Sequence, residues 1–287
     1  MATMRDIRRR IRTVRSIQQI TKALKMVAAA RLQRAQSRAA AARPYADEML
    51  AVMSHLVGIE AGEETQHPLL EVREPVNLGL VAITSDRGMA GSYNGNVIRR
   101  ATEVVREWDK EHVKLVTVGK KGRAFFAKRG YNIVADFPMP SSEVHFAEAR
   151  QISLQIRELF ESRQIDVARI IYTRFYSAIR QQVTDLQLLP AKPPEGEAKE
   201  GEVEYIFEPS PQALLGSLLP RYVDTQVFRA MLESLASEHG ARMTSMSAAT
   251  DNAGEMIDTL TLDFNRARQA AITKELAEIV GGAEALK

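Results

Sequence analysis

Apolar residues spaced three and four positions apart predict a long helix at the start of the chain. The segment 1–58 has no glycine before Gly58 and a single proline, Pro44. Its apolar positions form a helical stripe that thins into alanines further on: Ile7, Ile11, Val14, Ile17, Ile20, Leu24 and Val27. A helix of this extent is a rod of roughly 80 Å, which few globular domains could bury.

The segment 212–287 carries a second and more regular helical pattern. Nine positions alternate steps of three and four without a break: Met243, Met246, Thr250, Ala253, Ile257, Leu260, Phe264, Ala267 and Ala271. Such a repeat predicts a left-handed coiled coil. The alternative is an amphipathic helix that lies on a globular core. We favour the coiled coil because no other region offers a core long enough to cover this stripe.

The region between the helices, residues 75–208, has a different pattern. Apolar or alternating runs predict strands at 76–85, 113–119, 169–177 and 181–190. Helical stretches lie near 94–110, 120–129 and 145–162. Strands that alternate with helices predict an α/β domain with a largely parallel sheet, and the late strands add an antiparallel hairpin. The polar Pro/Gly/Glu stretch 190–204 predicts a mobile loop.

Together these segments predict a fold class. We expect an α/β central domain, Rossmann-like with a mixed sheet, plus a long antiparallel coiled coil formed by the N- and C-terminal helices. The helices run antiparallel because the chain leaves and returns through the same middle domain. Charge supports the pairing weakly, since residues 1–43 hold twelve Lys or Arg against one acid and residues 213–287 hold seven against ten. Exposed ion pairs contribute little.

Candidate catalytic motifs are weak throughout the chain. The loop ITSDRGMAGSYNGN (83–96) lacks the G-x-G-x-x-G spacing, and VGKKGRA (118–124) lacks the full phosphate-loop pattern. There is no cysteine, and the five histidines are scattered without metal-ligand spacing. We therefore predict no catalytic residue, cofactor or metal on this chain. We interpret 83–96 as a tight turn in which Asp86 and Arg87 bond to backbone or to each other.

Two other functions with a site of their own remain open from the residues alone, beside a third reading as a purely structural coiled-coil scaffold. The first is an α/β nucleotide-binding enzyme with helical extensions. The second is a basic coiled-coil protein that binds nucleic acid, although the N-terminal arginines are spread around their helix and no aromatic residues interleave with them for stacking. No apolar run reaches the ~18 residues of a membrane span, so we expect no direct membrane insertion.

Four stretches resemble the gamma subunit of the bacterial F-type ATP synthase, and the resemblance spans nearly the whole chain. They are MRDIRRRIRTVRSIQQITKALKMVAAARL (4–32), ITSDRGMAGSYN (83–94), EYIFEPS (204–210) and the C-terminal stretch 237–286. Within the last, ITKELAEIVGGAEA (272–285) fits the family signature position by position. The chain departs from the family at Lys25, where an acid is common, and at Met89, where leucine is common. It also lacks the cysteine insert of light-regulated versions.

The resemblance implies a central rotor shaft that couples proton flow to ATP synthesis, or ATP hydrolysis to proton pumping, and does no chemistry itself. Its implied partners are three alpha and three beta subunits, the epsilon subunit and the membrane ring of c subunits, at the cytoplasmic face of the cell membrane. No nucleic acid is implied. Matching the family motif assigns beta-subunit contacts to Arg268, Gln269, Thr273 and, more weakly, Arg242. It assigns an apolar tip in a sleeve of the catalytic head to Ile272, Leu276, Ile279 and Val280. Tyr205 and Glu208 would contact epsilon or the ring.

Overall fold

The structure, a computed structural model, describes residues 3–60, 67–191 and 211–284. It comprises two compact units that share the long helices α1 and α5. One unit contains Met1–Ala28 with Met243–Lys287, and the other contains Ala29–Arg242. Each unit therefore holds one part of α1 and one part of α5, so the unit boundaries cut through the two helices.

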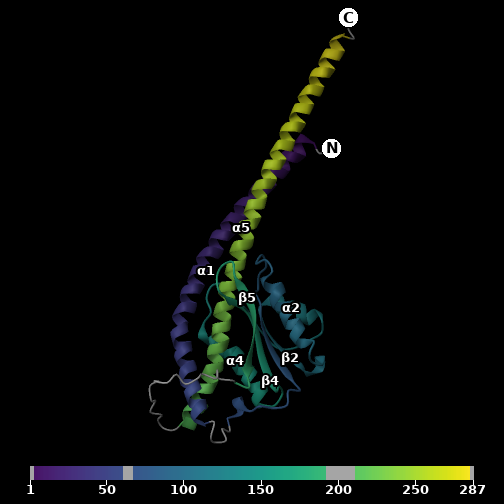
Figure 1. Cartoon of the computed structure of the whole chain (residues 1–287). Coiled ribbons are helices and arrows are strands. Elements are labelled where there is room, and N and C mark those ends of the chain that lie inside the picture. The colour runs from purple at the N-terminus through teal and green to yellow at the C-terminus, as the bar shows by residue number, and fades with distance from the viewer. Residues whose placement is uncertain (1–2, 61–66, 192–210, 285–287) are drawn as a thin grey trace. The chain divides into compact units, whose positions relative to one another are not determined.

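The helices and strands follow the predicted pattern closely (Figure 1). In chain order they are α1 (Met4–Glu60), η1 (Pro68–Leu70), β1 (Leu78–Ile83), α2 (Tyr93–Val105), η2 (Lys110–His112), β2 (Val113–Val118), α3 (Lys120–Lys128), β3 (Asn132–Phe137), α4 (Phe146–Glu161), β4 (Val167–Phe175), β5 (Gln181–Leu189) and α5 (Pro211–Glu284). The sequence did not predict β3. Its apolar run is short and flanked by polar residues, because an edge strand is only half covered.

The strands form one mixed sheet in the order β3-β2-β1-β4-β5. β1 pairs in parallel with β2 and β4, β2 pairs in parallel with β3, and β4 pairs antiparallel with β5. The predicted α/β domain with a late antiparallel hairpin is confirmed. The strand order places a topological switch point between β1 and β4, where open α/β sheets usually bind ligands.

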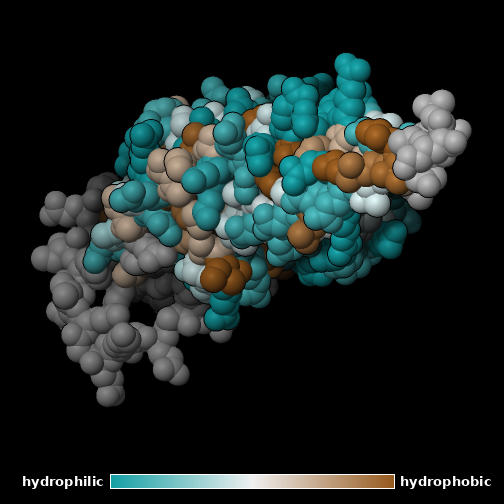
Figure 2. All heavy atoms as spheres, turned by 90° about the horizontal axis from the view of Figure 1, so that it is seen from above, coloured by the Kyte–Doolittle hydropathy of each residue, from teal (hydrophilic) through white to brown (hydrophobic). Residues whose placement is uncertain are grey.

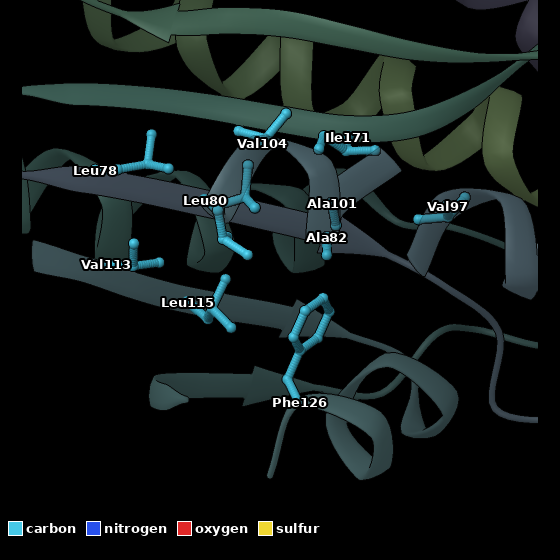
Figure 3. Packing of buried hydrophobic residues seen from close by; sticks show 11 residues of the cluster. Leu78, Leu80, Ala82, Val97, Ala101, Val104, Val113, Leu115, Phe126 and Ile171 are labelled. Carbon is cyan, nitrogen blue, oxygen red and sulfur yellow. The ribbon is translucent and has the colours of Figure 1, made fainter. Parts of the chain in front are cut away.

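A buried apolar cluster joins α2 and α3 to one face of the sheet (Figure 3). The strands contribute alternate residues because successive side chains of a strand point to opposite faces. The members labelled in the figure are Leu78, Leu80, Ala82, Val97, Ala101, Val104, Val113, Leu115, Phe126 and Ile171. Trp108 packs against this cluster from outside. This core fixes the carboxyl ends of the strands, where the crevice described below lies.

The other unit is an antiparallel helix pair, as predicted. Lys25 Nζ donates to Ser247 Oγ (2.9 Å), and Thr250 Oγ1 donates to Thr21 Oγ1 (2.8 Å). Further along, the guanidinium of Arg8 lies 5.3 Å from the centre of the Phe264 ring. The two residue numbers of each pair add to 271 or 272, so the register is constant along the pair.

The predicted seam of α5 is confirmed. All nine of its positions are buried or half-buried, and Met246 and Ala253 are the most enclosed. The regular alternation of three and four keeps the positions from Met243 to Ala267 on the side that faces α1.

The predicted stripe of α1 is confirmed at Ile7, Ile11, Val14 and Leu24, which are buried or half-buried, and is wrong at the other three positions. Ile17, Ile20 and Val27 are 47%, 59% and 49% exposed, whereas Thr21 and Ala28 are buried. The two successive steps of three from Val14 to Ile20 rotate the side chain by about 120° away from the seam. The side that faces α5 continues instead through Gln18, Thr21, Leu24 and Ala28, which are buried or half-buried.

Candidate functional sites at the end of α5 and in the sheet crevice

The C-terminal turns of α5 extend beyond the N-terminal end of α1. The constant register places Met4, the first residue of α1, opposite a position near Arg268. From Ile272 to Val280 every residue of α5 is exposed. Within this unit α5 therefore ends as a single helix (Figure 1).

This single-helix end presents the four predicted apolar tip residues. Ile272, Leu276, Ile279 and Val280 are 49%, 58%, 68% and 64% exposed. Their spacing of i, i+4, i+7 and i+8 puts them on one side of the helix. Figure 2 shows apolar side chains in brown beside the grey C-terminal residues. Exposed apolar faces of this kind are typical of surfaces that bind a partner.

Three of the predicted polar contacts lie on the same end. Arg268, Gln269 and Thr273 are exposed. Thr273 Oγ1 donates to the carbonyl of Gln269 at 2.9 Å, so its hydroxyl hydrogen is used within the helix while its oxygen can still accept. The structure therefore brings these three residues together with the tip. Tyr205 and Glu208 lie outside the described residues.

On the β2 side of the switch point, polar side chains that follow β1 bond to the start of α3. Asp86 Oδ1 accepts from the backbone N–H groups of Lys120 (3.0 Å) and Met139 (3.2 Å). Thr84 Oγ1 accepts from the N–H of Gly122 at 2.9 Å. Lys120 begins α3, so the Asp86 carboxylate takes the place that a phosphate takes at a helix N-terminus. The interpretation of 83–96 as a tight turn is confirmed for Asp86.

Arg242 lies in the other unit and differs from the other predicted contacts. Its side chain is only 10% exposed and pairs with Glu238, with Nη2–Oε1 at 2.5 Å. The same Nη2 donates to the carbonyl of Gly88 at 3.3 Å, and Nη1 donates to His239 Nδ1 at 3.2 Å. Its donors therefore serve this chain, and its assignment to a beta-subunit contact stays a prediction.

Burial in this cluster raises the pKa of Glu238 and lowers the pKa of His239. Both shifts favour the neutral form of the side chain. Burial raises the pKa of Glu238, and Arg242 opposes that rise. Burial, with the positive charges of Arg242 and Arg31, lowers the pKa of His239 to about 4. Because Nδ1 of His239 accepts from an arginine, the ring is neutral in the folded chain.

We expect this buried histidine to destabilise the fold as the pH falls. The unfolded chain binds the proton near pH 6.5 and the folded chain only near pH 4, so stability falls between these values. The loss by pH 5 is about 2 kcal/mol. Urea unfolding at pH 7 and pH 5 measures it, with His239→Asn as the control, which keeps an acceptor but cannot titrate. An equal loss in both proteins would contradict the prediction.

Other features of the described residues offer little for ligand chemistry. In residues 3–60, 67–191 and 211–284, no group of three or more His, Cys, Asp or Glu could hold a metal ion. A cavity of about 220 Å³ is lined by Ala39, Phe146, Phe228 and Leu232, and its Arg229 is paired with Glu233 at 3.1 Å. Across the same part of the chain, no helix has both the length and the apolar character needed to span a membrane.

The sequence missed the residues that fill the crevice, namely Ser234, Ser237 and Glu238. A signal was present, since the chain carries no Lys or Arg between Arg229 and Arg242. Lys and Arg are rarely fully buried unless they are paired, so their absence over three turns fits a buried segment. Fold and sites together define a protein with an antiparallel helix pair in one unit and an α/β sheet in the other. In the second unit, α5 occupies the switch point of the sheet, where α/β proteins usually bind a ligand.

Comparison with known proteins identifies the particular family. A family model described as ATP synthase matches residues 3–286. The chain is 51% identical to the ATP synthase gamma chain of Moorella thermoacetica over 287 residues and 49% identical to that of Heliobacterium modesticaldum over 293 residues. Each comparison covers 100% of this chain and 100% of the relative. The chain therefore belongs to the ATP synthase gamma-chain family.

Solved structures agree with this assignment. A chain of the central stalk and c-ring of Tetrahymena thermophila mitochondrial ATP synthase is 27% identical, with a TM-score of 0.61 over 80% of this chain and 99% of that one. A chain from the OSCP/F1/c-ring structure of Euglena gracilis mitochondrial ATP synthase has a TM-score of 0.68 at 19% identity. It covers 99% of this chain and 94% of its own length, and it shares the fold.

Proposed function

We propose that this chain is the central rotor subunit of a proton-translocating ATP synthase. It couples proton flow through a membrane ring to conformational change at catalytic beta subunits, and in reverse it couples ATP hydrolysis to proton pumping. Membership of the gamma-chain family supports the assignment of this chain to an ATP synthase complex. The observation that carries the mechanism is the single-helix, apolar end of α5, which the rest of its unit leaves exposed.

The partner of this end is a sleeve formed by three alpha and three beta subunits. Apolar side chains such as Ile272 and Leu276 contact such a sleeve without directional bonds, so no single angular position is held too tightly. As the helix turns, it presents a different face to each beta subunit. A rotor changes nucleotide affinity only by favouring a different conformation of each site, so this chain performs no chemistry itself.

Arg268, Gln269 and Thr273 provide the directional part of the contact. They are exposed just where α5 leaves α1, and the arginine fork suits acidic loops of a beta subunit because it holds a carboxylate in fixed geometry. These three residues provide the few directional contacts of the helix, whereas the apolar side chains of the tip form none.

The double variant Arg268→Ala/Gln269→Ala tests this contact. We expect its affinity for a complex of alpha and beta subunits to fall about tenfold, since a hydrogen bond to a charged group contributes about 1.5 to 3 kcal/mol. Binding is measured by titrating the alpha–beta complex with the full chain. The same variant is then assembled into the complete synthase to compare ATP hydrolysis with proton pumping.

Lys274→Ala/Glu278→Ala is the matched control. This pair lies on the same free helix, 78% and 65% exposed, and forms only a local contact of 3.6 Å. We expect it to bind as the unchanged chain does. Equal affinities for all three proteins would remove the proposed contact.

We place the α/β domain against the epsilon subunit and the ring of c subunits, at the cytoplasmic face of the cell membrane. The family supports a peripheral subunit of the synthase. The residues predicted for these contacts, Tyr205 and Glu208, stay a prediction. Copurification from membranes, followed by mass spectrometry of the partners, tests this placement. Absence of alpha, beta and c subunits from the purified complex would overturn it.

The engaged backbone amides at the start of α3 argue against the nucleotide-binding enzyme. The amides of Lys120 and Gly122 are engaged by Asp86 and Thr84, so a phosphate would have to displace both. Calorimetric titration of the isolated chain with ATP or NAD decides between the functions. Micromolar binding would revive the enzyme.

A further inference from the structure

Helix α5 enters the sheet crevice with a segment that is buried on all sides. Residues 231–240 are all buried, although they include Glu233, Ser234, Ser237, Glu238 and His239. Buried polar groups of this kind need hydrogen-bond partners. The partners of this segment show how α5 is held in the α/β domain.

The first contact replaces a missing stretch of strand. β1 pairs with β4 only as far as Ile171, and Thr173 lies two residues further on, so its backbone groups face the place where β1 has ended. Ser237 Oγ donates to the carbonyl of Thr173 at 3.0 Å, and the N–H of Thr173 donates to Ser234 Oγ at 3.4 Å. Two serines of α5 therefore take the place of a strand at the switch point.

The second contact is a close approach at Gly240. A Cβ atom at this position would lie 3.5 Å from Cα of Ala178 and 3.4 Å from the ring of Phe175. The nearest atom would be Nε2 of Gln181, at 2.9 Å. Because Gly240 has no side chain, the turn between β4 and β5 rests directly on the backbone of α5.

The third contact ties α5 to the turn that follows β1. Arg242 is paired with the buried Glu238 and donates to the carbonyl of Gly88. This guanidinium therefore bridges α5 and the turn, and the carboxylate beneath it compensates its charge. The three contacts reach different parts of the sheet: β4, the β4–β5 turn and the turn after β1.

We infer that this crevice is a socket that fixes the angle and the axial position of α5, and that Ser237, Gly240 and Arg242 are positioning residues for torque transfer. We use the name socket for Gly88, Thr173 and Ala178 with these three residues. One contact would leave α5 free to rotate about it, whereas three separated contacts prevent rotation and sliding. The inference rests on the proposed rotor function, because only a shaft under torque needs this rigidity.

A disulfide inside the socket tests whether its parts move relative to each other. The chain has no cysteine, so Ala178→Cys/Gly240→Cys introduces one defined pair. A Cβ atom at 240 would lie 3.5 Å from Cα of Ala178, and its nearest neighbour, Nε2 of Gln181 at 2.9 Å, ends a flexible side chain that can move aside. In the complete synthase we expect oxidation to close the bond, shown by the mass of the chain after thiol labelling. ATP hydrolysis and proton pumping should not change on oxidation.

A second variant loosens the socket without leaving a buried charge. Glu238→Gln/Arg242→Met removes both members of the ion pair, so we expect the chain to fold and assemble. The number of protons pumped per ATP hydrolysed should fall, because α5 could then turn in the socket without turning the α/β domain with it. Adding the Ala178→Cys and Gly240→Cys substitutions and oxidising them should restore this ratio, and reducing that bond should abolish the restoration. A merely structural role would change assembly and leave the ratio constant.

Two results would overturn the inference. One is loss of pumping when the disulfide closes in the otherwise unchanged chain, because it would mean that α5 moves in the socket during rotation. The other is an unchanged pumping ratio in the Glu238→Gln/Arg242→Met variant. Failure of the proposed function would look different, since a synthase containing the unaltered chain would then neither assemble nor pump.

Discussion

Replacing Gly119 by alanine is expected to lower the free energy of unfolding of the α/β domain by about 3 to 5 kcal/mol. Gly119 has φ +91°, a backbone conformation that side chains strongly disfavour. A Cβ atom there would overlap the carbonyl oxygen of Thr84. The backbone cannot move away, because the N–H of Gly119 donates to Phe137 and that of Thr84 donates to Val118.

Urea unfolding followed by tryptophan fluorescence measures this loss. Trp108 is the one tryptophan of the chain and packs against the domain core. Gly95→Ala is the matched control, since Gly95 lies in α2 with nothing within 4 Å of its Cβ position. Its alanine should stabilise the helix by about 0.5 to 1 kcal/mol. Similar effects of the two substitutions would show that Gly119 is not sterically required.

Replacing Arg157 by methionine is the second change with a large expected effect. Arg157 in α4 and Asp224 in α5 form a pair with Nη2–Oδ1 at 3.3 Å, and their side chains are only 13% and 6% exposed. Removing the arginine leaves a buried carboxylate without its counter-charge, which costs about 3 to 5 kcal/mol. Urea unfolding at pH 7 measures the change, again through Trp108.

The double variant Arg157→Met/Asp224→Leu distinguishes the cost of an unpaired buried charge from the cost of lost packing. Removing both charges avoids the uncompensated carboxylate, so most of the lost stability should return. A double variant as unstable as Arg157→Met alone would show that the cost comes from packing around α4. That result would contradict the electrostatic account.

Local pattern alone predicted most elements of this fold. β1 and β2 are apolar, β-branched runs whose ends the sequence marks with turn residues, and the seam of α5 keeps one spacing rule over nine positions. Helical and strand periods depend on neighbours within a few residues, so they can be read directly from the chain. β3 was missed because an edge strand needs only partial cover and therefore carries a weak pattern.

Some functional residues could likewise be predicted from the sequence, and others became visible only in the fold. The exposed residues Arg268 and Ile272 lie where the sequence motif indicated a partner-binding end. The role of Arg242 inside its own chain was not visible, because Gly88 lies far away in sequence and only the fold brings the two together. The socket serines were missed for the same reason.

The sequence by itself determined the two long helices, the α/β alternation between them and the unbroken seam of α5, because each depends on spacing along one segment. Tertiary structure decided which side of α1 faces that seam, where α1 ends beside α5, and what fills the crevice of the sheet. These features depend on contacts between residues that can be more than 200 positions apart, such as Thr21 and Thr250. Burial at such contacts is a property of two surfaces together, so neither segment encodes it alone.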